Sequence, residues 1–200
     1  MGINSHYIKN HIDMKKLHIL LVALVLALTA TAQKQNGRSM QVAGIAFYNL
    51  ENLFDTIPNN PEGRDEEFTP NGSRQWNGQK YWSKIRNMAY CISEMKTKTT
   101  PYGPAIIGVS EIENKSVLDD LVKDPQIAQW NLQVVHHDSP DSRGVDVGCL
   151  YNPKFFKLEN VTNHTLTGVS FRTRDQMCVV GNLWGQRIAV IVNHWPSRLG

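Results

Sequence analysis

The chain has 200 residues, of which 41% are hydrophobic and 20% charged, and its formal net charge is +3. This composition is that of one globular domain of ordinary size, and it excludes a disordered or low-complexity chain. The small net charge neither favours nor excludes binding to a long nucleic acid, since a local basic patch could still exist.

The first 32 residues have the pattern of a secretory signal peptide. Lys15 and Lys16 precede an apolar run over 17–28, and the small residues of 30–32 follow it. The run is shorter than the ~20 residues that a membrane-spanning helix needs, so we expect cleavage near Ala32 and no membrane span afterwards. We therefore expect residues 1–32 to be a leader and the rest to be exported, either to a periplasm or to the extracellular space. Cleavage would lower the formal charge from +3 to +1, because the leader holds three lysines and one aspartate.

Strand-like apolar runs alternate with helical patterns in the next part of the chain. The predicted elements, in chain order, are a strand over 42–50, a long surface loop over 55–80, a helix over 81–96, a strand over 105–110 and a helix over 116–122. The loop is inferred from its prolines and glycines, and the first helix from apolar residues spaced three and four apart. A strand, a helical connection and a second strand form the unit of a layered α/β sheet.

From Leu132 onward the pattern changes to short strands separated by turn signals. Strands are predicted over 132–137, 145–151, 161–166, 176–183 and 187–194, and we expect them to form a meander. Two layers of sheet with helices outside would bury the apolar faces of both kinds of strand. The sequence therefore predicts a mixed α/β sandwich rather than a doubly wound sheet.

Three cysteines, Cys91, Cys149 and Cys178, are present, with no CxxC pair and no zinc-ligand spacing. Each lies among apolar neighbours in a predicted helix or strand. We expect them to be small buried hydrophobic residues, and one disulfide would be compatible with an oxidising compartment.

Polar side chains stand at the ends of three apolar runs: Asn49, Glu111 and His194. Taken singly, such an asparagine usually caps a turn, such a glutamate is usually solvated, and such a histidine is usually structural. Taken together, amide and carboxylate oxygens suit a hard cation such as Mg²⁺, and a nearby histidine suits proton transfer. The pattern favours metal-assisted hydrolysis of a phosphoester.

Four segments carry a resemblance to a known family. They are 47–52 (FYNLEN), 109–114 (VSEIEN), 143–151 (RGVDVGCLY) and 192–197 (VNHWPS). In this order they resemble the motifs of the endonuclease/exonuclease/phosphatase superfamily. That superfamily includes pancreatic-type deoxyribonucleases, abasic-site endonucleases, neutral sphingomyelinases and inositol-polyphosphate phosphatases. The resemblance implies an α/β fold with a two-layer β-sandwich flanked by helices, in four layers α/β/β/α as in deoxyribonuclease I.

The resemblance also implies roles for individual residues. Glu111 matches the metal-binding glutamate, and Asn49 matches the asparagine that helps to hold the metal and the scissile phosphate. His194 resembles the histidine that contacts the phosphate or transfers protons, and Arg143 resembles a phosphate-contacting arginine. Glu51 stands where some members place a second acidic metal contact.

Four further residues are expected to support this site. Asn193 lies within the histidine motif and Arg198 follows it, and both are expected to bind the substrate phosphate. Asp146 and Tyr151 lie in the third motif and are expected behind the site, with Asp146 orienting the arginine or the histidine.

The superfamily's Gly-Asp-x-Asn and Ser-Asp-His motifs do not occur in this sequence. We therefore expect residues 33–200 to be only the N-terminal portion of such a domain. The expected function is that of an exported phosphodiesterase or nuclease that uses Mg²⁺, with Mn²⁺ and Ca²⁺ as alternatives. Its substrate would be a nucleic acid, a phospholipid headgroup or an inositol phosphate, and no stable protein partner is evident. The alternatives are a non-catalytic exported module that binds a phosphorylated or glycan ligand, and an inactive fragment.

Overall fold

The computed structural model describes residues 40–60 and 62–196. Contacts divide the chain into Met1–Gln41 and Val42–Gly200, and the fold below is that of the second unit. The expected leader and Arg198 lie outside the described residues. Within the described part, no helix has both the length and the apolar character needed to cross a membrane.

Two sheets form the centre of the fold. The first contains four strands in the order β1-β2-β4-β3, and the second contains β5, β6 and β7 in sequence order. Strands β1 and β2 are parallel, and every other neighbouring pair is antiparallel. The bounds are β1 Ile45–Leu53, β2 Ile106–Ile112, β3 Gln133–His136, β4 Asp146–Tyr151, β5 Phe156–His164, β6 Gln176–Leu183 and β7 Gln186–Val192.

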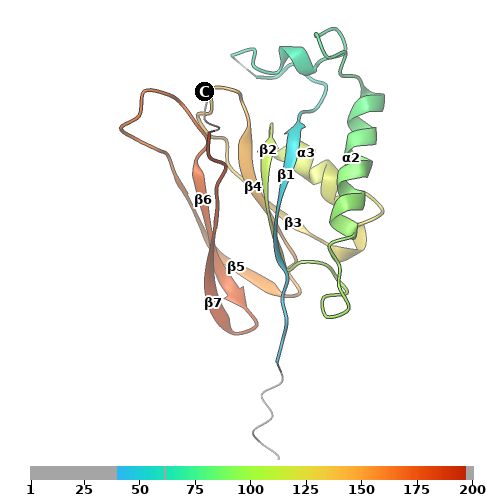
Figure 1. Ribbon diagram of the computed structural model, residues 1–200, viewed down its shortest axis with the longest axis vertical. Coiled ribbons are helices and arrows are strands. Elements are labelled where there is room, and N and C mark those ends of the chain that lie inside the picture. The colour runs from blue at the N-terminus through green and yellow to red at the C-terminus, as the bar shows by residue number, and fades with distance from the viewer. Residues whose placement is uncertain (1–39, 61, 197–200) are drawn as a thin grey trace, which may run out of the picture. The chain divides into compact units, whose positions relative to one another are not determined.

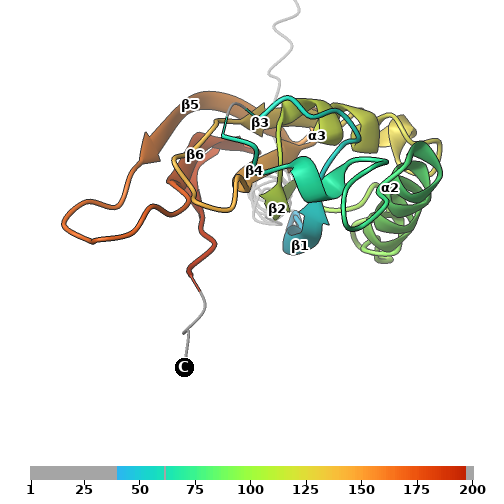
Figure 2. The same ribbon diagram turned by 90° about the horizontal axis from the view of Figure 1, so that it is seen from above.

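Helices α2 (Gly78–Ser93) and α3 (Lys115–Val122) cover one face of the four-stranded sheet, and the three-stranded sheet covers the other (Figures 1 and 2). Successive side chains of a strand point to opposite faces of its sheet, so β2 contributes side chains both to the core under the helices and to the core between the two sheets. Ile107 and Val109 pack in the helix-side core, whereas Ile106 packs in the core between the sheets. This arrangement confirms the predicted mixed α/β fold with two sheets. Within the described residues the layers are helix, sheet and sheet.

Both helices begin at an asparagine that caps the first turn. The side-chain oxygen of Asn77 accepts a hydrogen bond from the backbone N of Lys80 at 3.1 Å, and that of Asn114 accepts from Ser116 at 2.9 Å. Such caps satisfy backbone donors that have no partner inside the helix. Helix α2 thus begins three residues before the predicted start and ends at Ser93.

Three strand predictions need correction. The first strand does not end near Asn49 but continues to Leu53, because β1 resumes its pairing with β2 at Ile112 after a shift of register. Strand β5 begins at Phe156 rather than at residue 161, because its whole length pairs with β6. The strands after residue 132 do not form one meander, since β3 and β4 belong to the first sheet.

The segment over 55–80 is more ordered than the loop that the sequence predicts. It contains a short 3₁₀ helix, η1 (Glu66–Phe68), and the ring of Phe68 stacks on Phe54 with centroids 4.0 Å apart. Asp65 is buried, and its carboxylate accepts hydrogen bonds from two backbone N–H groups of the loop. The loop is therefore held against the end of β1.

The cysteines only partly follow the expectation of burial. Cys149 is buried and Cys178 is partly buried, but Cys91 is exposed on α2. All three are free thiols. The prediction for Cys91 is wrong because its position falls on the solvent side of the helix.

Candidate functional site

Side chains from the ends of several elements meet at Glu111. Nε2 of His194 lies 3.2 Å from Oε1 of Glu111, and both terminal nitrogens of Arg143 lie 3.4 Å from the same oxygen. Nη2 of Arg143 also donates a hydrogen bond to Oδ1 of Asn52 at 2.6 Å. Glu111 and Asn52 are the penultimate residues of β2 and β1, Arg143 precedes β4, and His194 follows β7. Segments far apart in sequence thus build one polar site.

The backbone at this site departs from regular strand geometry. Glu51, Asn52 and Glu111 have φ values of 52°, 58° and 57°, in the left-handed region. Residues other than glycine pay a steric cost there, and such residues concentrate at functional sites. The two left-handed segments coincide with the register shift between β1 and β2. Side chains here therefore do not follow the simple alternation of a strand.

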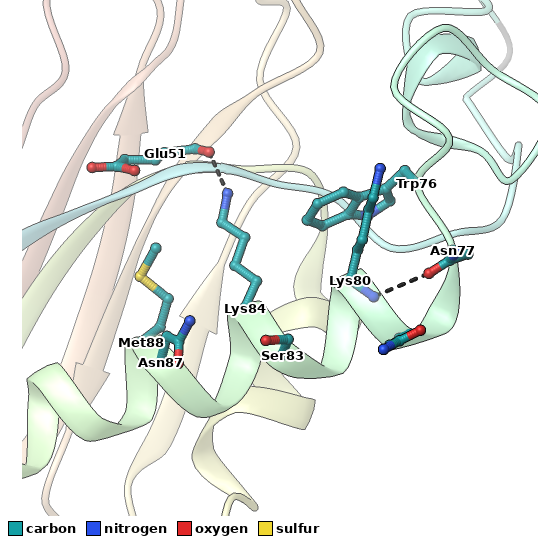
Figure 3. A pocket seen from close by; sticks show the side chains of 9 residues that line it. Glu51, Trp76, Asn77, Lys80, Ser83, Lys84, Asn87 and Met88 are labelled. Carbon is teal, nitrogen blue, oxygen red and sulfur yellow. Dashed lines mark hydrogen bonds between the residues drawn. The ribbon is translucent and has the colours of Figure 1, made fainter.

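Lys84 of α2 holds the left-handed turn of β1. Its Nζ donates to the carbonyl oxygen of Asn52 at 3.1 Å and to that of Glu51 (Figure 3). Burial lowers the pKa of Lys84, and the nearby carboxylates of Glu51 and Glu111 oppose that shift. Lys84 is not among the site residues predicted from the sequence. A signal existed, because the residue lies in the apolar stripe of α2, three positions after Tyr81 and four before Met88.

The pKa shifts of Glu111 and His194 give the two side chains different charge states near neutral pH. Burial raises the pKa of Glu111, but Arg143 and His194 together leave that pKa below its ordinary value. Burial and the charge of Arg174 lower the pKa of His194, against the opposing effect of Glu111. Near neutral pH the site therefore holds an ionised carboxylate beside a neutral imidazole, which is able to accept a proton.

A buried ion pair holds the loop that carries Arg143. Nη1 of Arg174 lies 2.8 Å from Oδ1 of Asp141, and the two side chains are 5% and 1% exposed. The other oxygen of Asp141 accepts a hydrogen bond from the backbone N of Arg143 at 2.8 Å. Sequence reasoning missed this pair, since the two residues are 33 positions apart and neither belongs to a periodic pattern.

The predicted residues Asn49 and Glu51 lie beside this site, but within the described part of the chain neither forms a hydrogen bond or an ion pair with Glu111. Oδ1 of Asn49 accepts a hydrogen bond from the backbone N of Glu51 at 2.8 Å, and Asn49 is the register partner of Ser110. Glu51 is exposed and lines a groove along α2 (Figure 3). Asn52, which was not selected as a site residue, is the asparagine that contacts Arg143.

The expectations for Asp146 and Tyr151 are wrong. Asp146 orients neither the arginine nor the site histidine, because its carboxylate is bonded to His136 at 2.9 Å and to the backbone N of Ser139 at 2.9 Å. Tyr151 lies at the far end of β4 and packs edge-on against Phe156. Strand β4 runs antiparallel to β2, so its first residues, not its last, lie near the end of β2.

Asn193 lies next to the site histidine and lines a small cavity with it. Its Nδ2 atom donates a weak hydrogen bond to the carbonyl oxygen of Ile191 at 3.5 Å. Its Oδ1 atom is buried and has no hydrogen-bond partner among the described residues. Asn193 therefore keeps a free acceptor beside His194.

The residues at the site fit a hard divalent cation. Hydrogen bonds to the Glu111 carboxylate within the described chain all reach Oε1, which leaves Oε2 as a ligand atom. The side-chain oxygen of Asn49, one strand away, is a second hard donor with one hydrogen bond. Carboxylate and amide oxygens are ligands that Mg²⁺, Mn²⁺ and Ca²⁺ accept.

The comparison with protein families decides the membership of the chain. Residues 44–200 match the model described as the Endonuclease/Exonuclease/phosphatase family. The chain belongs to this family. Members are generally hydrolases, nucleases and phosphatases among them, that act on phosphoesters with divalent metals, which agrees with the predicted family and class of chemistry. No curated protein matched the chain.

Solved structures give only a loose likeness. A structure of TDP2 from Caenorhabditis elegans is 13% identical to this chain, with a TM-score of 0.43. The match covers 62% of this chain and 33% of the TDP2 chain. A truncated TDP2 from the same organism is 13% identical with a TM-score of 0.43, covering 76% and 46%. The human Nocturnin catalytic domain with bound sulfate is 22% identical with a TM-score of 0.36, covering 48% and 39%. The chain thus spans less than half the length of these proteins.

Proposed function

We propose that the protein is an exported phosphodiesterase that requires a divalent metal and cleaves nucleic acid. The observation that carries the proposal is the convergence of Arg143 and His194 on the carboxylate of Glu111. A fixed cation, a neutral imidazole and an ionised carboxylate within hydrogen-bonding reach are the groups that hydrolysis of a phosphoester needs.

Each residue has a distinct part in this proposal. Arg143 would bind a non-bridging phosphate oxygen, for which a planar guanidinium is well suited. In the neutral ring of His194 the proton is on Nε2, which faces the ionised Glu111. His194 would therefore take a proton from the attacking water through Nδ1, or hold the phosphate through the N–H of Nε2. Glu111 and Asn49 would hold Mg²⁺, or Mn²⁺ or Ca²⁺ in its place, with Glu51 as a further carboxylate nearby. The bound ion would neutralise charge that develops on the phosphate.

The surface beside the site supports a nucleic acid rather than a phospholipid headgroup or an inositol phosphate. A groove of about 750 Å³ runs along α2 from Glu51 and is lined by Lys80, Lys84 and the half-buried indole of Trp76 (Figure 3). Cationic and aromatic side chains in one groove suit a phosphate backbone and the faces of bases. The carbonyl contacts of Lys84 connect this groove to the turn that carries Asn52.

Export rests on the leader pattern of residues 1–32. We expect the mature chain to begin after Ala32. Expression with the leader, followed by fractionation and N-terminal sequencing of the product, tests it. A full-length product that stays in the cytosol would contradict export and would leave the enzymatic proposal unaffected.

The test of the activity is hydrolysis of bis(p-nitrophenyl) phosphate and of plasmid DNA by the purified chain, with Mg²⁺ and with EDTA. We expect turnover that EDTA abolishes and that Glu111→Gln lowers by at least about 10²-fold. Glu94→Gln is the matched control, because Glu94 is an exposed carboxylate at the end of α2. A folded protein that binds DNA without cleaving either substrate would instead indicate a binding module.

A further inference from the structure

His136, the last residue of β3, lies between two carboxylates outside the site described above. Its Nε2 atom is 2.9 Å from Oδ2 of Asp146, and its Nδ1 atom is 3.8 Å from Oδ1 of Asp138. The side chains of His136 and Asp146 are each 6% exposed, whereas that of Asp138 is 90% exposed. One ring nitrogen is therefore bound within the protein, while the other faces a solvated carboxylate.

The hydrogen bonds of Asp146 determine which ring nitrogen carries a proton. Its Oδ1 atom accepts hydrogen bonds from the backbone N–H and the hydroxyl of Ser139. Its Oδ2 atom faces Nε2 of His136, so that nitrogen is the donor. In the neutral ring, Nδ1 then carries a lone pair. Among the described residues, no hydrogen bond reaches this Nδ1 atom, although the side chain is more than nine-tenths buried.

This arrangement is the one in which proteins orient a histidine toward a metal ion. A carboxylate holds one ring nitrogen, which fixes the tautomer and leaves the other nitrogen for the metal. Ligand atoms of His136, Asp138 and Asp146 all lie within 4.8 Å of one another. Metal–ligand bonds of about 2.0–2.2 Å would allow one ion to contact both Nδ1 and Oδ1 across their separation of 3.8 Å.

The surroundings leave room for further ligands. A cavity of about 530 Å³ borders His136 and Asp138 and is also lined by Asn59 and Asn114. An imidazole nitrogen favours Zn²⁺ and related transition metals over Mg²⁺ and Ca²⁺. We propose that Nδ1 of His136 and the carboxylate of Asp138 bind a transition-metal ion of the Zn²⁺ type, with Asp146 as a positioning residue. This site does not include Glu111.

The site lies at the base of the loop that carries Arg143. His136 and Asp146 close this loop over residues 137–145, and Asp138 lies two residues into it. An ion bound at Asp138 would therefore join the loop to the end of β3. The ion would restrain the segment that presents Arg143 to Glu111.

Titration of the full chain with Zn²⁺ alone, followed by calorimetry, tests the proposal. We expect Asp138→Asn to weaken binding at least tenfold, since Asp138 is exposed and its replacement should not disturb folding. Glu94→Gln should bind as the unaltered chain does, and Glu111→Gln should retain the Zn²⁺ site. Equal affinity in Asp138→Asn, loss of binding in Glu111→Gln, or no binding by the folded chain would each overturn the proposal.

Two further measurements test the positioning role and the effect on the loop. Asp146→Asn is expected to weaken Zn²⁺ binding about 10–100-fold, because its amide holds the ring less well. Saturating Zn²⁺ is expected to slow hydrogen exchange of the amides in residues 137–145 and to shift the ¹⁵N resonance of Nδ1 of His136. An imidazolium with both nitrogens protonated in the presence of Zn²⁺ would overturn the assignment of Nδ1 as a ligand.

Discussion

The guanidinium of Arg174 and the carboxylate of Asp141 form an ion pair that is almost fully enclosed, with Nη1 and Oδ1 2.8 Å apart. The same carboxylate accepts the backbone N–H of Arg143 through its second oxygen. The position of Arg143 thus depends on a residue that lies just before β6 in the second sheet. Folding of the sandwich and assembly of the site are linked through this pair.

Removal of one partner of this pair should be costly. Because Arg174→Met leaves the Asp141 carboxylate buried without its cation, we expect the free energy of unfolding to fall by about 3–5 kcal/mol. The matched control is Arg187→Met, whose exposed pair with Glu159 should contribute less than about 1 kcal/mol. Urea unfolding of both variants measures the difference. Similar losses in the two variants would contradict the structural importance of the buried pair.

Arg143→Met should impair the site without unfolding the chain, since its side chain is 49% exposed. We expect kcat/KM for bis(p-nitrophenyl) phosphate to fall by about 10²-fold, because a preorganised donor to the phosphate is lost. The pKa of Glu111 should rise, because the arginine lowers it in the unaltered protein. Steady-state kinetics and an NMR titration report the two effects. Arg86→Met, on the exposed side of α2, should leave both quantities unchanged.

Glu113 should make stability depend on pH. Burial raises its pKa to about 8 from an ordinary value of 4.5, with the carboxylates of Asp55 and Asp65 adding to the shift. The folded state therefore binds a proton that the unfolded state releases between these values, so stability falls as the pH rises through that window. The Glu113→Gln variant has no carboxyl group at this position, so its stability should not fall for this reason as the pH rises. Its stability relative to the unaltered chain should rise by about 1.4 kcal/mol per pH unit within the window.

Urea unfolding of both proteins at several values between pH 4 and pH 9 checks the behaviour of Glu113. The difference in unfolding free energy should be flat below the window, rise within it and become flat again above it. A difference that does not change with pH would show that Glu113 is ionised in the folded protein at neutral pH.

The cysteines should react at very different rates. Burial raises the pKa of Cys149 to about 12, so this thiol is protonated and enclosed at pH 8, whereas Cys91 is exposed. Ellman's reagent should modify Cys91 first, and Cys149 only after unfolding. Cys91→Ser should remove the fast phase. Modification of Cys149 in the folded protein at the rate of Cys91 would contradict the packing between the sheets.

Much of the fold was predictable because the hydrophobic pattern is strong. The apolar run before Glu111 and the helical stripe of α2 both appear in the structure within a few residues of the predicted bounds. The meeting of Glu111 with His194 also agrees with the expectation that polar residues at the ends of apolar runs build one site, although β2 and β7 belong to different sheets. Both inferences rest on local periodicity and on where strands end.

The remaining features depend on information that a local pattern does not contain. Tyr151 was misplaced because the direction of β4 relative to β2 is set by the topology of the sheet and not by the residues of the strand. The contact of Asn52 with Arg143 was not predicted, because left-handed residues interrupt the alternation that strand reasoning assumes. Lys84 and the pair of Asp141 with Arg174 arise from contacts more than 30 positions apart.

The left-handed residues at the ends of β1 and β2 lower the stability of the fold while they position side chains of the proposed site. Glu51 and Asn52 each occupy a conformation that costs about 1–3 kcal/mol for a residue other than glycine. Glycine at either position would relieve that cost, and at position 52 it would also remove the amide that holds Arg143. A library selected for heat resistance alone should therefore accumulate glycine at these positions and lose the amide that holds Arg143, whereas alternating selection for turnover should keep the strained side chains.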